Sequence, residues 1–372
     1  FLLAIGWITG RRADGAGYFL GNKRSPWYVV AIGLIGDSLS GVTFISVPGQ
    51  VGTARCSYLQ VVFGYVLGYL VIAQVLLPLY YRLNLTSIYA YLGSRFGRSA
   101  ELTGASFFLL SRTLGAAARL YLAANVFQTF VFGPLGIPFA LAVSVIIGLM
   151  LVYTWQGGIK TLVWTDSFQS LFLVFGVVMS IGIIASDLGL GLGALVSTVV
   201  ESPLSQVFVS DWRAPDQFWK QFTSGAAIAV VMTGLDQNSM QKNLSCRSLG
   251  EAQKNLYTFS VILVAVNVFF LGLGVLLYEY LKLRGIPAPA QADQLFPTLA
   301  FQHLGAGAAL VFVLGLTAAT FNSADSVLTT LTTSFCIDFL GFERRPGWTE
   351  AARARWRHGV HFAFAVVLLG AI

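Results

Sequence analysis

Charged side chains are scarce in this sequence. Only 10% of its 372 residues are Asp, Glu, Lys or Arg, whereas soluble globular proteins carry about 25%. Apolar residues make up 56% of the chain, and the mean hydropathy is +0.73. These values exclude an ordinary soluble domain and indicate a protein whose main solvent, and first expected partner, is membrane lipid.

Cysteine is also rare. The three cysteines, Cys56, Cys246 and Cys336, are far apart and form no C-x-x-C pair, so neither a disulfide framework nor a zinc site is predicted. The net charge of +7 does not indicate a nucleic-acid partner, because basic residues of membrane proteins gather in cytoplasmic loops. The sequence starts at Phe1 and stops at Ile372 inside apolar stretches, so both ends are interpreted as truncated.

Long apolar segments recur along the chain. A membrane-spanning helix needs about 20 mostly apolar residues, and eight segments meet this requirement, with a partial one at each end. The complete spans are predicted at 27–49, 58–81, 100–132, 137–153, 165–186, 223–241, 256–281 and 306–340, and the partial ones at 1–9 and 358–372. The predicted fold class is therefore an all-α polytopic membrane protein.

Basic residues divide unevenly between the two sides of these spans. When the loop 10–26 is placed inside the cell, sixteen of the 23 Lys and Arg residues fall on the inner side, Lys242 among them. Five fall outside, and Arg112 and Arg119 lie within a span. The positive-inside rule supports this topology for a multi-pass protein of the cell membrane, with the polar connections 187–222 and 282–305 outside.

Two predicted spans are unusually polar. Segment 27–49 contains several glycines and serines, Asp37 and Pro48, and segment 306–340 carries a central run of Thr, Ser and Asn with Asp325. Such groups are costly in hydrocarbon unless they are paired or line a cavity. Polar, broken helices at membrane depth are typical of the substrate and ion sites of secondary transporters, although Ser and Thr hydroxyls also bond back to their own helix.

Five stretches of the chain form an ordered set of family motifs. They are 36–49 (GDSLSGVTFISVPG), 85–97 (LTSIYAYLGSRFG), 157–169 (GGIKTLVWTDSFQ), 236–254 (DQNSMQKNLSCRSLGEAQK) and 318–338. Through them the chain resembles the sodium:solute symporter family, which includes carriers of sugars, proline, pantothenate, iodide and sialic acid. The resemblance implies Na⁺-coupled symport of a small organic solute by alternating access, and not an enzyme.

The same resemblance implies the architecture. The family has the LeuT-type fold, in which two inverted repeats of five helices follow an extra leading helix. In this chain the first repeat corresponds to 27–186, and the second to 223–372, which is incomplete at its C-terminal end.

A sodium site is implied between the first and eighth core helices. Backbone carbonyls and hydroxyl or amide oxygens suit Na⁺ as a hard cation. The residues that match the family's main site are Gly36, Leu39 and Ala319 through their carbonyls, and Asn322 and Ser323 through their side chains. Asn322 departs from the family pattern, which has a hydroxyl there, so altered affinity or selectivity is expected.

Some relatives have a second sodium site, and its oxygen-bearing positions are also present here. The matching residues are Asp166, Asn322, Asp325 and Ser326, which predicts a second site for Na⁺ or a proton. The alternative is that Asp166 caps the N-terminus of its helix after the Gly157–Lys160 stretch, where a carboxylate is favourable.

The substrate site is implied between the first, third, sixth and seventh core helices. The matching positions are Ser40, Thr43, Arg112, Ala229, Met232 and Thr233. Sugar carriers have Gln, Asn and Tyr near Thr43, Ala229 and Met232, so a hexose is disfavoured.

Arg112 lies deep in a long apolar helix, where a charge is expensive and usually functional. One interpretation is that it grips an anionic solute, because Arg pairs bidentately with carboxylates and certain sialic acid carriers use an Arg in this helix. The alternatives are an ion pair with Asp37 or Asp166, or snorkelling to an interface. Arg119, further along, is expected to reach the outer interface.

Three other functional classes remain alternatives. A membrane-embedded enzyme needs a nucleophile with a base, or a metal, and the buried polar residues do not resemble such a set. A sensor domain related to this family would share the helices and lose coupling residues. A proton-coupled carrier is the third alternative, because two of the four residues of the second site are carboxylates and could hold a proton.

Overall fold

The computed structural model describes Ile5, residues 15–344 and residues 347–372. The predicted partial span 1–9 and the first part of the loop 10–26 therefore lie largely outside the described residues. The α-helices are α2 (Gly15–Leu20), α3 (Trp27–Ser38), α4 (Gly41–Ala54), α5 (Tyr58–Val71), α6 (Leu77–Arg82), α7 (Ala90–Phe96), α8 (Arg98–Phe127), α9 (Phe139–Asp187), α10 (Leu192–Glu201), α11 (Phe218–Ala229), α12 (Gln237–Leu244), α13 (Leu249–Arg284), α14 (Leu295–Gln302), α15 (Gly305–Ser334) and α16 (Glu350–Ala371).

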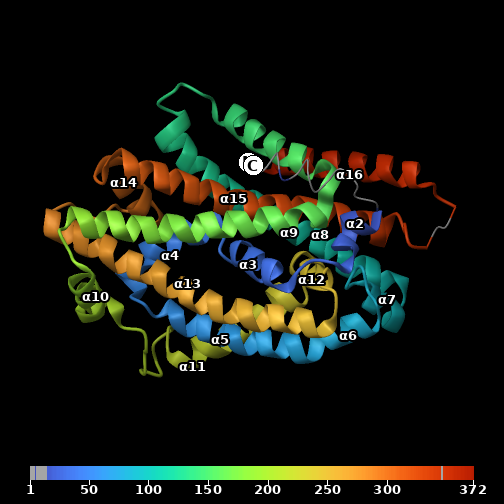
Figure 1. Ribbon diagram of the computed structural model, residues 1–372, viewed down its shortest axis with the longest axis horizontal. Helices are drawn as coiled ribbons and strands as arrows, with labels where there is room; N and C mark the ends of the chain where they lie inside the picture. Colours follow the sequence, from blue (N-terminus) through green and yellow to red (C-terminus); the bar gives the residue numbers. More distant parts are fainter. Residues whose placement is uncertain (1–4, 6–14, 345–346) are drawn as a thin grey trace.

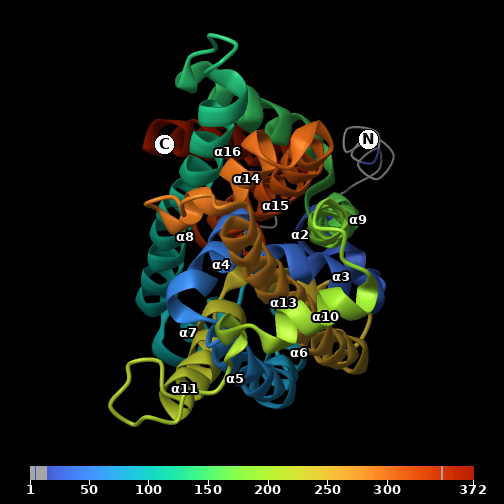
Figure 2. The same cartoon turned by 90° about the vertical axis from the view of Figure 1, so that its left-hand side faces the viewer.

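The long helices run side by side along the molecule, and the short ones lie between them. Figure 1 shows α9, α13 and α15 along the long axis, with α3, α4 and α12 packed against them in the middle. In the end view of Figure 2, α5 and α11 lie together at one side and α16 lies at the opposite side. The centre of the bundle thus combines the short helices α3, α4 and α12 with the long helices against which they pack.

The distribution of polarity is the reverse of that in a soluble protein. Leu110 and Leu114 on α8 and Phe175 on α9 are exposed, while Thr329 and Thr333 on α15 are fully buried. Apolar outer faces fit a surrounding lipid phase, and buried hydroxyls need partners inside the bundle. This arrangement agrees with the predicted all-α membrane protein.

In the described part of the chain, four helices are long and apolar enough to cross a membrane, and α3 with α4 forms a bent fifth candidate. The four are Tyr58–Arg82, Gly158–Asp187, Leu249–Arg284 and Gly305–Phe339. The predicted spans at 100–132, 223–241 and 358–372 are also helical, but α8 and α16 carry several charges and α11 is short.

Several predicted boundaries were wrong. The predicted segments 137–153 and 165–186 are confirmed as two separate helices, because a non-helical Gly158 at φ 50° divides α9, but the second helix begins at Gly158 rather than at 165. Helix α16 begins at Glu350 rather than at 358, because the Thr349 side chain caps it by accepting a hydrogen bond from Ala352 N. The connections 187–222 and 282–305, which were predicted only as polar segments, contain the helices α10 and α14.

The loops that the charge distribution placed on the same side of the membrane lie at the same end of the bundle. At one end Arg284 Nη2 lies 2.7 Å from Asp187 Oδ2, which joins the C-terminal ends of α13 and α9. At the other end Ser25 forms a β-bridge with Cys246, and Tyr81 donates to the Cys246 carbonyl over 3.1 Å. The predicted outer connections thus meet at one end, and the predicted inner loops meet at the other.

Two breaks interrupt the helices at the centre of the bundle. Helices α3 and α4 meet at an angle of 60°, so the polar segment 27–49 is broken as predicted. The predicted continuous span 223–241 is instead divided into α11, a π-helical turn at Val230–Gly234, and the buried helix α12. The other polar segment, 306–340, forms a continuous helix with a π-helical end at Phe335–Phe339.

Candidate functional site

The break between α3 and α4 exposes backbone at the centre of the bundle. Leu39 and Ser40 have non-helical backbone angles, with ψ values of 77° and 172°. Gly41 then starts α4 so close to α15 that a Cβ on it would lie 2.8 Å from Thr320 Oγ1. Only a glycine allows this approach, and it brings the broken backbone against the polar stretch of α15.

Gly36 and Asn322 are in direct contact. A Cβ at Gly36 would lie 2.3 Å from Asn322 Nδ2, so the absence of a side chain here allows α3 and α15 to meet. Asn322 Nδ2 donates to the backbone carbonyl of Asp166 over 2.9 Å, and Gly36 N donates to Ser170 Oγ over 2.9 Å. Among the described residues, the buried Oδ1 of Asn322 has no hydrogen-bond partner.

Ser323 and Leu39 both line the central cavity. The single proton of Ser323 Oγ is shared between the carbonyls of Ala319 and Thr320, at 3.3 and 3.2 Å. Because the hydroxyl is the donor in both contacts, its lone pairs stay free to bind a cation. All five residues predicted for the sodium site thus lie on α15 or on the end of α3 that faces it. Their role as sodium ligands stays a prediction.

The residues predicted for a second cation site are brought together only in part. Ser326 Oγ donates to Asp166 Oδ2 over 3.2 Å, and Asn322 binds the Asp166 backbone. The carboxylate of Asp325 turns elsewhere, because it accepts hydrogen bonds from Tyr153 Oη and from Ser326 N. Asp166 lies well inside α9, so the alternative that it caps a helix N-terminus is wrong.

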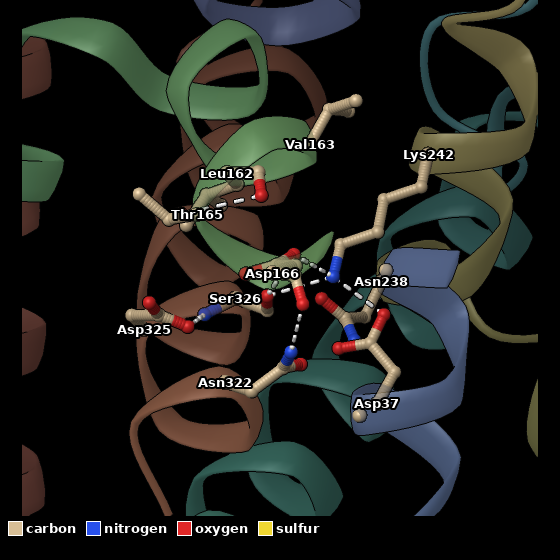
Figure 3. A network of polar contacts seen from close by, with 12 residues as sticks. Asp37, Leu162, Val163, Thr165, Asp166, Asn238, Lys242, Asn322, Asp325 and Ser326 are labelled. Carbon is tan, nitrogen blue, oxygen red and sulfur yellow. Dashed lines mark hydrogen bonds and ion pairs between the residues drawn. The ribbon is translucent and has the colours of Figure 1, made fainter. Parts of the chain in front are cut away.

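A buried lysine occupies the middle of this group. Lys242 Nζ lies 2.5 Å from Asp37 Oδ2, 2.5 Å from Asp166 Oδ2 and 2.8 Å from Ser326 Oγ (Figure 3). The lysine side chain is only 1% exposed, whereas the charge count had placed it in an inner loop. Sequence reasoning missed it because the polarity of α12 resembles that of a loop, although the helix is buried.

A cavity of about 170 Å³ adjoins the break. Four of the six predicted substrate positions line it, namely Arg112, Ala229, Met232 and Thr233. Ser40 and Thr43 are not among its lining residues. The other lining side chains come from every side of the bundle core and are Asp37, Ser38, Leu39, Tyr58, Tyr65, Tyr69, Arg119, Ile228, Asn238, Ser239, Leu263, Asn267, Ser323 and Val327.

Arg112 forms an ion pair that the sequence analysis did not consider. Its Nε lies 2.6 Å from Asp236 Oδ2, and its Nη2 donates to the Met232 carbonyl over 3.2 Å. The expected alternatives, a pair with Asp37 or Asp166, are therefore wrong. The sequence did mark Asp236, which opens one of the five family motifs. The helix break that turns the Asp236 side chain toward α8 was not predicted.

Arg119 differs from Arg112 in having no such partner. It lines the cavity, and among the described residues its guanidinium forms neither a hydrogen bond nor an ion pair. The residue faces the cavity from α8, and the expectation that it reaches the outer interface stays a prediction. A half-buried guanidinium without a partner can pair with a carboxylate or another anionic group.

The family model described as the sodium:solute symporter family matches residues 18–371. The chain belongs to this family. A solved structure, the substrate-bound outward-open state of a Na⁺-coupled sialic acid symporter, superposes with a TM-score of 0.89 at 22% identity and covers 100% of this chain and 79% of that chain. The LeuT-type fold is therefore confirmed, while the repeat boundaries 27–186 and 223–372 stay a prediction.

Relatives with established names are similar over most of this symporter. The sodium/sialic acid symporter SiaT of Proteus mirabilis (strain HI4320) is 24% identical over 353 residues, covering 91% of this chain and 68% of the relative. The sodium/glucose cotransporter of Vibrio parahaemolyticus is 27% identical over 372 aligned positions, covering 91% of this chain and 66% of the relative. The chain spans about half the length of the human sodium/iodide cotransporter, to which it is 28% identical.

These findings fix the class of activity. As a member of the sodium:solute symporter family, the protein is a multi-pass plasma-membrane carrier that couples Na⁺ to the transport of a small solute, and it is not an enzyme. The geometry adds a polar, partly charged cavity beside a helix break, as expected for a carrier of this architecture.

Proposed function

We propose that the transported solute is a small anion and that Arg119 binds its negative group. The observation that carries the proposal is the guanidinium of Arg119, which lines the cavity without a partner in the described structure. Arg112 lies on the same helix, but its charge is balanced by Asp236. An uncompensated cation in a membrane interior is costly, and an anionic solute would offset that cost.

The cavity wall also suits a solute with an apolar or ring-shaped part. Tyr58, Tyr65 and Tyr69 contribute hydroxyls and ring faces on the side formed by α5. Tyrosine combines a large apolar surface with a polar end, so these side chains accommodate both parts of an organic acid. That two relatives are named as sodium/sialic acid symporters supports an organic acid as the solute class.

Sodium is proposed to bind where α3 breaks against α15. The ligand set comprises the carbonyls of Gly36, Leu39 and Ala319 and the side chains of Asn322 and Ser323. Two observations support it, namely the unpartnered Oδ1 of Asn322 and the contact of Gly36 with Asn322. Oxygen ligands of this kind suit a hard monovalent cation.

Coupling follows from the position of Leu39 and Ser323, which belong both to the sodium ligands and to the cavity wall. A sodium ion that fixes the backbone at Leu39 also fixes one side of the solute cavity. The solute then binds better to the sodium-bound conformation, and by linkage sodium binds better when the solute is present.

The test is binding of a panel of solutes, namely proline, pantothenate, monocarboxylates, sialic acid and hexoses, to the purified full-length protein in Na⁺ and in K⁺. We expect Na⁺-dependent binding of an organic acid. Arg119→Gln should weaken it more than about tenfold, since hydrogen bonds to a charged group contribute about 1.5–3 kcal/mol. Arg213→Gln, in the exposed loop before α11, is the control.

Three results would contradict this proposal. Selective binding of a hexose would show that the solute has no negative group, and binding of any solute that is unaffected by Arg119→Gln would show that Arg119 does not hold it. Binding that is equal in Na⁺ and K⁺ would place this chain among the sensor-like or proton-coupled alternatives.

A further inference from the structure

Asn267 brings an unsatisfied oxygen to the wall of the central cavity. The residue lies on α13, lines the cavity and is only 1% exposed. Its Nδ2 donates to the Leu263 carbonyl, one turn earlier in the same helix, over 2.8 Å. Among the described residues, its Oδ1 has no hydrogen-bond partner. A buried amide oxygen in this state is costly, and the protein gains when a donor binds it.

The orientation of this amide follows from its own helix. If its two ends were exchanged, the oxygen would face the Leu263 carbonyl, and two acceptors would repel each other. The nitrogen therefore turns back to the helix, and the oxygen is the end left for the cavity. A second asparagine of the cavity wall, Asn238, differs because its Oδ1 accepts a hydrogen bond from Thr330 Oγ1 over 2.9 Å.

The cavity thus presents two unsatisfied groups of opposite kind. Arg119 on α8 supplies a cationic donor, and Asn267 on α13 supplies a neutral acceptor. A solute that satisfies both needs a negative group and, elsewhere in the molecule, an O–H or N–H group. A plain carboxylic acid would pair with Arg119 alone and would leave the Asn267 oxygen buried without a donor.

We infer that Asn267 selects organic acids that carry an O–H or N–H group in addition to the carboxylate. The inference rests on the proposed anionic solute and deepens it by naming a second recognition group. Hydroxy acids, amino acids and N-acylated acids share this chemistry, because each of them can donate a hydrogen bond. A site with a buried acceptor discriminates against an analogue that leaves this acceptor unpaired.

A matched series of acids tests this selection. Propionate, lactate and alanine share one carbon skeleton and carry hydrogen, hydroxyl or ammonium at the second carbon. Sialic acid is a larger probe that carries hydroxyl and amide N–H groups. Binding of each acid to the purified full-length protein is measured in Na⁺. We expect at least one donor-bearing acid to bind about tenfold more tightly than propionate, and its identity shows which kind of donor is recognised.

The variant Asn267→Leu removes the oxygen and changes the side-chain volume little. We expect it to weaken binding of the preferred acid about tenfold and to leave propionate unchanged, so that the preference disappears. Ser260→Ala is the control and should keep the preference. Ser260 is also buried in α13, but it does not line the cavity and its hydroxyl donates to the Tyr257 carbonyl of the same helix.

Three results overturn the role of Asn267 while the proposed anionic solute stands. The first is equal binding of propionate and the donor-bearing acids by the wild type, a measurement that needs no variant to fold. The second is binding of propionate alone. The third is a preference that survives in Asn267→Leu, because the acceptor would then be Asp37, which also lines the cavity and whose Oδ1 is likewise unpartnered among the described residues.

Two other results overturn the proposed function and this inference with it. Arg119→Gln should weaken binding of every acid that the wild type binds, propionate included, because it removes the partner of the carboxylate. Unchanged binding in Arg119→Gln contradicts the anionic solute itself. So does a wild type that binds none of the four acids.

Discussion

Asn322 on α15 binds α9 at two points through a single amide group. Its nitrogen holds the backbone of Asp166 and approaches Ser170 Oγ at 3.4 Å, while its oxygen is left without a partner among the described residues. A hydroxyl at this position has one proton to donate, whereas the amide donates twice and still presents an oxygen. The replacement therefore keeps an oxygen ligand and adds a bond between α15 and α9.

The Ser323 hydroxyl offers a direct test of the sodium site. We expect Ser323→Ala to raise the sodium dissociation constant about tenfold, because losing one hydrogen-bond-like ligand costs about 1–1.5 kcal/mol. The measurement is ²²Na⁺ binding without solute. Ser180→Ala is the matched control, since Ser180 is buried and its hydroxyl only binds Gly176 in its own helix. Equal affinities in the two variants would remove Ser323 from the ligand set.

Gly36 tests the contact between α3 and α15. In Gly36→Ala the new methyl group would lie 2.3 Å from Asn322 Nδ2 and 2.7 Å from Ser170 Oγ, so the helices must separate. We expect a loss of about 1–3 kcal/mol in stability from overpacking, together with weaker sodium binding. The control is Gly182→Ala, where nothing lies within 4 Å of the added Cβ. Its melting temperature should be unchanged or slightly higher than that of the wild type. Normal sodium affinity in Gly36→Ala would contradict the proposed site.

The sequence predicted residue types better than partners. Motif position alone located Gly36, Asn322 and Ser323, which the structure places at one helix contact. It did not reveal that Asp325 turns to Tyr153 or that Arg112 turns to Asp236, partners that lie 172 and 124 positions apart in the chain. Such choices are fixed by how distant helices pack, and local spacing carries no record of them.

At the scale of elements, the end of α11 and the start of α12 form the second break of the bundle. Asp236 has two functions there, because its Oδ1 accepts a hydrogen bond from Ser239 N at the N-terminus of α12 and its Oδ2 binds Arg112. A cap and an ion pair thus share one carboxylate. The break is where the chain changes from an apolar helix to a buried polar one.

Two substitutions at this residue separate the cap from the ion pair. Asp236→Asn keeps a capping oxygen and loses the charge, whereas Asp236→Ala loses both, so the alanine variant should be less stable by about 1 kcal/mol. Both variants free Arg112, and both should therefore alter the affinity for an anionic solute in the same direction. Thermal melting in detergent and solute binding are the measurements. Equal melting temperatures would show that the cap contributes nothing.

The sequence predicted the helix break that lies in a segment rich in glycine and serine. It did not predict the break in a segment that has few of these residues. The segment 27–49 is dense in such residues and bends by 60°. The break at Leu235 and Asp236 follows the apolar run of α11 with Gly234 alone as a local signal. The tertiary contacts that stabilise it, above all Arg112 with Asp236, are not readable from a window of sequence.

At the scale of the whole molecule, one end of the bundle is predicted to face the outside of the cell and the other end the inside. The end with the Asp187–Arg284 pair collects the predicted outer connections, and the end with the Ser25–Cys246 bridge collects the inner loops. The order of the spans and the grouping of the loops at two ends were predictable because hydropathy and charge report directly on the lipid environment. Which of the two ends faces the inside of the cell stays a prediction. The sequence did not predict which helices face the lipid and which line the core, because this depends on how the helices pack.

Orientation is testable with single cysteines. The native Cys56, Cys246 and Cys336 are all buried, so background labelling of the folded protein should be low. We expect a membrane-impermeant maleimide to label Arg213→Cys on intact cells, and to label Arg95→Cys only after permeabilisation, since both positions are exposed but at opposite ends. Labelling of Arg95→Cys on intact cells would reverse the assigned sides.

Helix α12 has a consequence for how the protein is made. Six of its eight residues are polar, and all eight are buried. The machinery that inserts helices into the bilayer reads hydrophobicity, and it would not accept such a segment as a span. α12 must therefore wait until α13 and α15, which pack against it, have been synthesised and inserted. Defects in this helix should then appear during biosynthesis, as chains degraded before they reach the cell surface.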